Sequence, residues 1–242
     1  MQELGKIAKT FNRNAGNYDN FALIHEEIAQ YMCNFMQVNG VNFENCKVCD
    51  LGSGTGVLTG KFLDNFQNFQ LDCLDISPNS LAILRQKYPG VGAVLGDILS
   101  CNLTKYDALI SSMALQWLGG DISVFINKIP IKTRCFFAIP VNNSLGNLRE
   151  NMKKLGLIDT IMQFPDAEEI VQIAGEKFHT RHEVKIFGKS ADIPSAIGHL
   201  RGIGAGYSPR KNSIHDVKKI LASNIPTDLV YEVLFLQCEP KK

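Results

Sequence analysis

The 242-residue sequence has almost no net charge, because 25 lysines and arginines nearly balance 24 acidic residues and leave a formal charge of +1. A field this weak does not draw the chain as a whole to nucleic acid or to a membrane surface. Long apolar runs are also absent: no stretch approaches the roughly 20 residues of a membrane helix, and Met1–Lys6 form no apolar signal core. We therefore expect a soluble cytoplasmic protein with no nucleic-acid or membrane partner.

The sequence also lacks the short motifs of common metal and nucleophile centres. Neither H-E-x-x-H nor G-x-S-x-G occurs, and the C-x-x-C of Cys46 and Cys49 has no second pair. The seven cysteines are an odd number scattered along the chain, which indicates buried reduced thiols and no disulfide framework. His179 and His182 stand three apart in an alternating segment and should face opposite sides. We expect no metal site, and we interpret His25 as a surface or packing residue.

A glycine-rich turn between a short apolar strand and a helix is the most informative stretch that is present. It reads VCDLGSGTGVL from Val48 to Leu58, with a glycine at every second position of the turn. Glycine adopts positive φ and lets a ligand approach the backbone. The helix that follows directs free N–H groups and the positive end of its dipole at that ligand. We expect Gly52, Ser53, Gly54 and Gly56 to form a binding loop.

The acidic residue before this turn indicates which ligand is bound. The dinucleotide pattern is G-x-G-x-x-G, whereas here Asp50 precedes G-x-G-x-G. A carboxylate in that place would repel a pyrophosphate but can hold an ammonium group, directly or through water. The stretch resembles motif I of the class I methyltransferases, and we predict S-adenosylmethionine as the cofactor. A nicotinamide dinucleotide is the alternative.

The order of predicted elements indicates the fold class. Strands and helices alternate through residues 47–139, which predicts a parallel sheet with helices on both faces. The predicted strands are 47–51, 71–75, 91–95, 107–111, 134–139, 178–187 and 229–237. The predicted helices are 3–14, 21–36, 58–66, 78–88, 122–129, 145–155, 167–174, 191–201 and 213–221. We expect an α/β, Rossmann-like class I methyltransferase fold, with a mostly parallel seven-stranded sheet flanked by helices and a helical substrate cap.

The chain is predicted to form a single domain over residues 1–242. Within it, residues 1–40 should form an N-terminal helical lid and residues 46–140 the S-adenosylmethionine-binding core. Residues 141–225 should contribute in part to the cap and substrate region, and residues 226–242 the final strand. Ligands of open α/β sheets bind outside the carboxyl ends of the strands, so the strand ends are the places to search for binding residues.

Acidic residues follow the second and third predicted strands. Asp75 lies nineteen residues after Gly56, where a carboxylate can accept both ribose hydroxyls; Ile76 is counted with it in the donor site. The alternative for Asp75 is an acid at a helix start or in a solvated loop. Asp97 resembles the adenine-binding acid of the methyltransferases, with Ile98 packing on the ring, and its alternative is an ordinary turn aspartate.

Two serines end the fourth predicted strand. In the methyltransferase superfamily that strand end lies beside the methionine part of the donor, so Ser111 and Ser112 are candidate donor-binding residues. Capping of the strand end is the alternative for both.

Three segments outside the glycine turn resemble the malonyl-[acyl-carrier-protein] O-methyltransferases of biotin synthesis, the BioC family. They are FNRNAGNYD at 11–19, ALQW at 114–117 and HLRGIGA at 199–205. The resemblance implies methylation of the free carboxylate of a malonyl thioester, and a partner that is an acyl carrier protein bearing malonyl-phosphopantetheine. A carboxylate with a pKa near 4 is already ionised at pH 7. No general base is therefore required, and no residue is assigned a catalytic role beyond positioning.

The same resemblance suggests acceptor-binding residues. Tyr18 is the candidate lid over the donor and acceptor, Gln116 and Trp117 are candidate walls of the acceptor pocket, and Arg201 is the candidate grip for the carboxylate through its bidentate fork. The alternatives are ordinary packing for Tyr18 and Trp117, and a solvated arginine for Arg201.

A basic segment offers a surface for the acidic carrier protein. From Glu176 to Lys219, nine lysines and arginines stand against four acidic residues, which gives a net charge of +5. A solvated face is the alternative. Two rival functions are methylation of another small carboxylate or a quinone precursor, and a non-catalytic interaction protein that keeps the donor fold.

Overall fold

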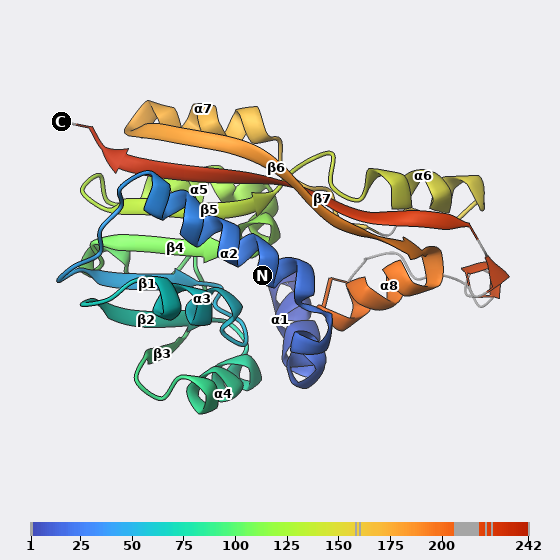
Figure 1. Cartoon of the computed structure of the whole chain (residues 1–242), viewed down its shortest axis with the longest axis horizontal. Coiled ribbons are helices and arrows are strands. Elements are labelled where there is room, and N and C mark those ends of the chain that lie inside the picture. Colours follow the sequence, from blue (N-terminus) through green and yellow to red (C-terminus); the bar gives the residue numbers. More distant parts are fainter. Residues whose placement is uncertain are drawn as a thin grey trace.

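The computed structural model describes residues 2–157, 159, 161–205, 218–220, 222–223 and 225–241. These residues build one seven-stranded sheet in the order β3-β2-β1-β4-β5-β7-β6, with helices on both faces (Figure 1). The first five strands pair in parallel, and β7 runs antiparallel to both of its neighbours. The predicted fold class, a mostly parallel Rossmann-like sheet of seven strands, is confirmed.

All seven strands occur where the sequence predicts them. Their bounds are β1 Lys47–Leu51, β2 Gln70–Asp75, β3 Gly92–Leu95, β4 Ala108–Ser112, β5 Arg134–Pro140, β6 Phe178–Asp192 and β7 Pro226–Pro240. The last two are longer than predicted, because they pair with each other over all fifteen positions. Backbone hydrogen bonds to a partner can extend a strand past the residues whose apolar alternation predicts it.

The α-helices also follow the predicted order. The α-helices are α1 Gln2–Asn14, α2 Leu23–Val38, α3 Val57–Asn65, α4 Pro78–Lys87, α5 Ile122–Lys128, α6 Gly146–Lys154, α7 Ala167–Lys177 and α8 Ile193–Gly202. Three 3-10 segments also occur: η1 Ala15–Phe21, η2 Leu103–Lys105 and η3 Leu115–Asp121. The sequence did not predict η1 and η3, which lie near the carboxyl ends of the parallel strands. The predicted helix 213–221 lies largely outside the described residues.

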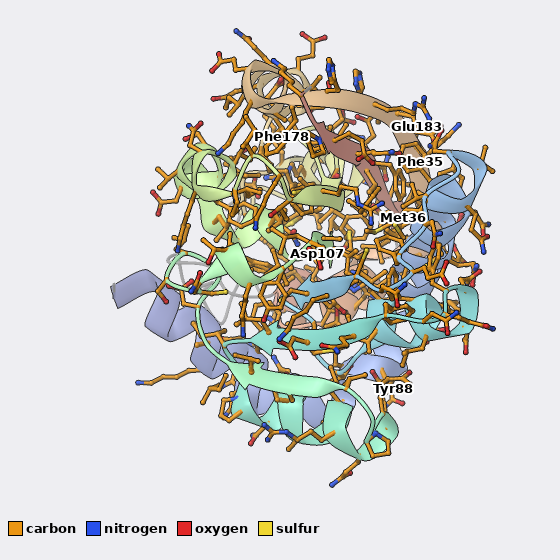
Figure 2. The ribbon with its side chains drawn as sticks, turned by 90° about the vertical axis from the view of Figure 1, so that its left-hand side faces the viewer. Phe35, Met36, Tyr88, Asp107, Phe178 and Glu183 are labelled. Atoms are coloured by element: carbon orange, nitrogen blue, oxygen red, sulfur yellow. The ribbon has the colours of Figure 1, made fainter. Side chains whose placement is uncertain are left out.

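Alternation along the central strands divides the core into two layers. In β1, Val48 packs on the face covered by α2 and α3, whereas Cys49 and Leu51 pack on the face covered by α5 and α7. The inner strands are therefore buried on both faces, as parallel sheets require. Figure 2 shows Met36 of α2, from the first layer, and Phe178 at the start of β6, from the second.

The β6–β7 hairpin extends past the rest of the sheet. β5 pairs with β7 only between Val233 and Cys238, so the half of β7 from Pro226 to Glu232 has β6 as its strand partner. Helices α6 and α8 pack against this extension (Figure 1). They occupy part of the range predicted as the cap, and the division into lid, core and cap stays a prediction.

Two expectations about the chain's surface and thiols can be compared with the described residues. Within them, no helix is both long and apolar enough to cross a membrane. All seven cysteines are free thiols, and Cys49 is buried while Cys46 is partly exposed. The interpretation of the C-x-x-C as buried structural thiols agrees with the position of Cys49 but not with that of Cys46.

The aromatic cluster around Phe62 holds α3, and with it the glycine turn, against the sheet. The Phe62 ring is fully buried and lies 4.8 Å, centroid to centroid, from each of Phe43, Phe66 and Phe69. Phe62→Ala should lower the free energy of unfolding by about 3–5 kcal/mol through lost burial and a cavity. Leu63→Ala, on the same helix but 37% exposed, should lose less than half as much. Urea unfolding followed by circular dichroism measures both, and equal losses would contradict this account.

Candidate functional site

The glycine turn adopts the backbone that its sequence predicts. Gly52, Gly54 and Gly56 have φ of 68°, 54° and 92°, in the left-handed region where other residues are strained. A Cβ on Gly52 would lie 2.5 Å from the Cβ of Ala114, and one on Gly56 would lie 2.8 Å from the Tyr88 ring. Gly54 has no neighbour within 4 Å of that position. Packing therefore requires glycine at positions 52 and 56. At Gly54 no protein atom fills the space that a side chain would occupy.

A cavity of about 1080 Å³, which includes space open to solvent, lies at the carboxyl ends of the parallel strands. Eleven of the predicted site residues line it: Tyr18, Asp50, Gly52, Ser53, Gly54, Asp75, Ile76, Asp97, Ile98, Ser112 and Trp117. Gly56 and Ser111 do not. The Ser111 hydroxyl donates to the Leu51 carbonyl at 2.8 Å, which is the strand-capping alternative.

Asp50 lies beneath the turn and is 1% exposed. Its carboxylate accepts a hydrogen bond from the Thr59 hydroxyl at 2.7 Å. Burial raises the Asp50 pKa to about 7, against the opposing effect of the Thr59 hydrogen bond. A cation beside the carboxylate would favour its charged form, so this position suits an ammonium group of a ligand.

Asp75 is held in place by two backbone groups. One oxygen accepts from the Ser77 N–H at 2.7 Å and the other from the Gly54 N–H at 2.8 Å. Burial raises the Asp75 pKa, and these hydrogen bonds oppose the shift. Each carboxylate oxygen can accept a second hydrogen bond, so Asp75 can still receive hydroxyl groups of a ligand.

Other polar groups of the cavity wall have mixed roles. Asp97 accepts from the Leu99 N–H at 3.0 Å, as the turn alternative predicts, and it also lines the cavity. The hydroxyls of Ser53 and Ser112 are buried and have no hydrogen-bond partner among the described residues. Since buried polar groups are normally paired, these two hydroxyls fit a polar ligand in the cavity.

The N-terminal segment is tied to the glycine turn by polar contacts. The Asp19 carboxylate in η1 accepts from the Thr55 hydroxyl at 2.7 Å and pairs with the Lys87 ammonium at 2.5 Å. Lys87 also donates to the Thr55 carbonyl at 3.1 Å. These contacts place η1, and with it Tyr18, beside the opening of the cavity.

A second cavity, of about 410 Å³ with its open part included, adjoins the first. The two share five lining residues: Phe11, Tyr18, His25, Met113 and Trp117. The Phe11 and Trp117 rings meet edge to face at 5.1 Å. The Gln116 side chain lines the second cavity, and its Nε2 donates to the Met113 carbonyl at 2.8 Å. Both predicted acceptor walls, Gln116 and Trp117, are therefore at this place.

Met113 is the strained residue at the boundary of the two cavities. It follows β4 with φ of 55°, and its N–H donates to the Ala138 carbonyl at 2.9 Å. A non-glycine residue in this region costs about 1–2 kcal/mol, and such strain is concentrated at functional sites. The strain here turns the chain from β4 into η3, which carries Gln116 and Trp117.

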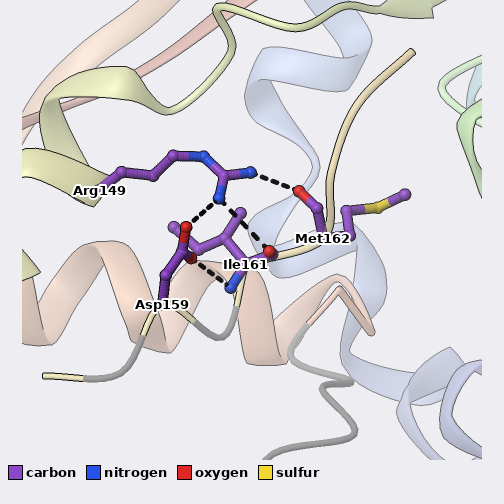
Figure 3. Close-up of polar contacts among 4 residues, drawn as sticks. All are labelled: Arg149, Asp159, Ile161 and Met162. Atoms are coloured by element: carbon purple, nitrogen blue, oxygen red, sulfur yellow. Dashed lines mark hydrogen bonds and ion pairs between the residues drawn. The ribbon is translucent and has the colours of Figure 1, made fainter.

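One wall of the second cavity is held by Arg149 of α6. Its guanidinium donates to the carbonyls of Ile161 and Met162 and pairs with the Asp159 carboxylate (Figure 3). Asp159 also accepts from the Ile161 N–H at 2.9 Å. Ile161, Met162 and Phe164 line the cavity, so this network positions an irregular segment that an apolar contact alone would not fix.

The structure does not bring every predicted residue to the cavities. Arg201 is exposed at the end of α8 and lines neither cavity, because this helix directs Leu200 and Ile203 inward instead. Its assignment as the carboxylate grip stays a prediction that this geometry does not support. Of the basic segment, Arg210 and Lys211 lie outside the described residues, and Lys219 donates to the Leu155 carbonyl at 3.4 Å.

Sequence reasoning missed several residues that the structure brings to the site. His25 lines both cavities and is 5% exposed, so the packing interpretation describes its burial but not its position. Tyr231, Asp19, Thr55 and Phe11 were not singled out as site residues. The signal for Asp19 and Phe11 was present in the segment 11–19, whereas Tyr231 lies in a strand with no distinguishing pattern.

Within the part of the chain that the structure describes, no three histidine, cysteine or acidic side chains lie together as metal ligands would. His179 and His182 are both exposed on β6.

Known methyltransferases resemble this chain in sequence. The sequence profile of a methyltransferase domain matches residues 48–129, which span β1 through α5. A malonyl-[acyl-carrier protein] O-methyltransferase from Neorickettsia risticii is 26% identical over 219 residues, with 89% of this chain and 88% of the relative covered. A second relative of that name, from Ilyobacter polytropus, is 23% identical and covers 89% of this chain and 84% of its own length.

Solved structures support the fold. The magnesium protoporphyrin IX methyltransferase from Synechocystis, with bound SAH, superimposes with a TM-score of 0.61 at 15% identity, covering 91% of this chain and 86% of that one. A putative methyltransferase from Haloferax volcanii, in complex with its Trm112 activator, gives 0.62 at 17% identity and covers 98% of each chain. Residues 48–129 thus match a methyltransferase domain, the chain has the fold of known methyltransferases, and its predicted resemblance to the malonyl-[acyl-carrier protein] O-methyltransferases is confirmed.

Proposed function

We propose that this protein transfers a methyl group from S-adenosylmethionine to the free carboxylate of malonyl-[acyl-carrier protein], an early step of biotin synthesis. The observation that carries the proposal is the junction of two cavities. One contains the glycine turn, the buried Asp50 and the half-buried Asp75, and the other is mostly apolar. Relatives that carry this activity in their names align with 89% of the chain.

The first cavity fits the donor by the chemistry of its residues. Asp50 would hold the ammonium group, Asp75 the ribose hydroxyls, and Asp97 with Ile98 the adenine. The unpartnered hydroxyls of Ser53 and Ser112 add polar groups to the same wall. When bound, S-adenosylmethionine supplies a methyl group activated by its sulfonium sulfur.

The chain's own residues contribute position and exclusion of water. The acceptor carboxylate is ionised at neutral pH, so no residue has to remove a proton from it. Phe11, Met113 and Trp117 form an apolar collar where the cavities meet. Alignment of two reactants in such a collar can supply several kcal/mol of barrier reduction. Methylation masks the carboxylate charge, so that the product resembles an ordinary acyl chain.

The second cavity suits the end of a thioester arm. Its wall is apolar apart from a few side chains, and both α8 and the segment held by Arg149 contribute to it. A carrier protein outside could deliver such an arm through its phosphopantetheine.

The acceptor is tested with labelled donor. Malonyl-[acyl-carrier protein] should accept methyl groups with kcat/KM at least tenfold above malonyl-coenzyme A, because both carry the same phosphopantetheine arm but only the carrier protein adds contacts by docking on the surface. Free malonate lacks both the arm and the protein, so its kcat/KM should be far lower still. Labelled-methyl transfer at saturating donor measures all three. Transfer to free small acids at equal efficiency would favour a different carboxyl acceptor, and donor binding without any transfer would favour a non-catalytic role.

The clearance at Gly54 gives a prediction for the donor site. Gly54→Ala should weaken S-adenosylmethionine binding at least tenfold, since the new Cβ would occupy the space that the cavity leaves beside the turn. Gly40→Ala is the matched control, because Gly40 also has positive φ, 69°, and also has no neighbour within 4 Å, but lines neither cavity. Both variants should lose about 1 kcal/mol of stability from backbone strain. Calorimetric titration should show a binding defect in Gly54→Ala only; two equal affinities would remove Gly54 from the donor site.

The raised pKa of Asp50 predicts a pH dependence. Above pH 7 Asp50 is charged and attracts the donor's ammonium group, and as the pH falls through about 7 it takes up a proton and donor affinity declines. The slope should approach tenfold per pH unit. In the free protein, the folded state holds this proton more tightly than the unfolded chain, so the contribution of Asp50 to stability decreases as the pH rises from about 4 to about 7.

Asp50→Asn removes the titrating group and should flatten both profiles. Titration calorimetry between pH 5.5 and 7.5 and urea unfolding over the same range measure them. The proposal for Asp50 fails if wild type and variant show parallel pH profiles for donor affinity.

A further inference from the structure

Four polar side chains from four elements meet in the interior beside the second cavity. Tyr18 comes from η1, His25 from α2, His199 from α8 and Tyr231 from β7. The His25 ring lies 5.8 Å from Tyr18, 6.2 Å from Tyr231 and 6.4 Å from His199, centroid to centroid. Segments more than 200 residues apart in sequence thus converge on His25.

Most polar atoms of this cluster are unpaired. His25 and Tyr231 are 5% and 2% exposed, and neither the Nε2 of His25 nor the Tyr231 hydroxyl has a hydrogen-bond partner within the described residues. The same holds for both ring nitrogens of His199. Burying a polar atom without a partner destabilises a fold. The two unpaired atoms whose residues line the second cavity, the Nε2 of His25 and the Tyr231 hydroxyl, therefore indicate a ligand that completes them.

The position of each residue shows which atoms such a ligand could reach. Tyr18, His25 and Tyr231 line the second cavity, and Tyr18 and His25 also line the first. His199 lines neither. A group bound between His25 and Tyr231 would therefore lie at the end of the second cavity that adjoins the donor.

The chemistry of these side chains favours an anion. Burial lowers the His25 pKa to about 3 and raises the Tyr231 pKa, so both are neutral at physiological pH. The Tyr18 hydroxyl lies 2.7 Å from the Nδ1 of His25. When the hydroxyl donates to Nδ1, the imidazole proton is on Nε2, which becomes a donor, as the Tyr231 hydroxyl is.

We propose that His25 and Tyr231 form the grip for the acceptor's carboxylate. In this arrangement Tyr18 fixes the tautomer of His25, and the Nε2–H of His25 and the O–H of Tyr231 donate to the carboxylate oxygens. The inference rests on the proposed function, because it names the residues that select a malonyl group over an uncharged acyl group.

Neutral donors suit this reaction better than a cation. Methyl transfer removes the charge of the carboxylate, so an arginine pair would stabilise the substrate more than the transition state and would slow the step. A neutral imidazole and a phenol hold the anion through hydrogen bonds alone and release an uncharged ester. The two neutral donors would also hold the carboxylate without Arg201, which lines neither cavity.

The test uses two ligands that differ only in the carboxylate. Malonyl-pantetheine and acetyl-pantetheine are titrated into protein saturated with S-adenosylhomocysteine, which permits binding without transfer. Wild type should prefer the malonyl ligand, and Tyr231→Phe and His25→Phe should each reduce that preference about tenfold or more while acetyl binding stays unchanged. His25→Gln should restore part of it, because its amide can place an N–H near the position of Nε2. Unchanged preference in both Phe variants would overturn the proposal.

A matched control separates recognition from structure. Tyr106 is also a buried tyrosine, but its hydroxyl donates to Asp72 at 2.9 Å and it lines neither cavity. Tyr106→Phe should lower the urea midpoint and keep the malonyl preference. Tyr231→Phe should leave the midpoint unchanged or raise it, since the lost hydroxyl has no hydrogen-bond partner among the described residues. A lower midpoint with an unchanged preference would make Tyr231 a structural residue.

Methyl transfer distinguishes this proposal from the one on which it rests. If wild type and Tyr231→Phe methylate malonyl-[acyl-carrier protein] with the same KM, the carboxylate grip is wrong and the function stands. If the Phe variants lose the preference for malonyl-pantetheine but wild type does not methylate the malonyl carrier protein, the grip stands and the acceptor is another carboxylate. Loss of the preference together with a KM raised about tenfold supports both.

Discussion

The hydrogen bonds from the Gly54 and Ser77 N–H groups to the Asp75 carboxylate hold the ligand end of this fold together. Through them, the end of β2 fixes both the glycine turn after β1 and the start of α4. Helix α1 depends on the same anchor, because Asn12 accepts hydrogen bonds from the Asn79 N–H at 3.0 Å and from the Ser77 hydroxyl at 3.3 Å. Without this carboxylate, two backbone donors at the centre of the cavity wall would lose their partner, and the surfaces that rest on them would shift.

The long β6–β7 hairpin is the second constraint on the site. Because β7 pairs with β5 over only part of its length, its remaining half extends past β5 and brings Tyr231 within ring contact of His25 on α2. Helices α6 and α8 cover this projection. The first cavity is therefore built from the parallel half of the sheet, whereas the second is built where the antiparallel hairpin, α8 and the N-terminal segment meet.

The donor half could be predicted from the sequence because its signals are local. Glycine spacing, strand–helix alternation and the cap at Ser77, whose hydroxyl accepts the Ser80 N–H at 3.1 Å, all act within a few residues. The acceptor half could be predicted only at Tyr18, Gln116 and Trp117, because its other contacts are distant in sequence. No local pattern shows that α8 directs Leu200 inward and leaves Arg201 exposed, or that His25 and Tyr231 meet. The packing role of Gly56 was likewise hidden, since the Tyr88 ring that requires it comes from the far end of α4.

The position of β6 at the border of the sheet has a consequence for self-association. Its outer side offers backbone groups to any other strand, and it exposes Val184 and Ile186, the combination that invites edge-to-edge aggregation. Exposed Arg181, Lys185 and Lys189 are spaced along the same strand. Two copies pairing antiparallel along this edge would bring like charges together, so the strand that carries the exposed apolar residues also carries charges that oppose such pairing.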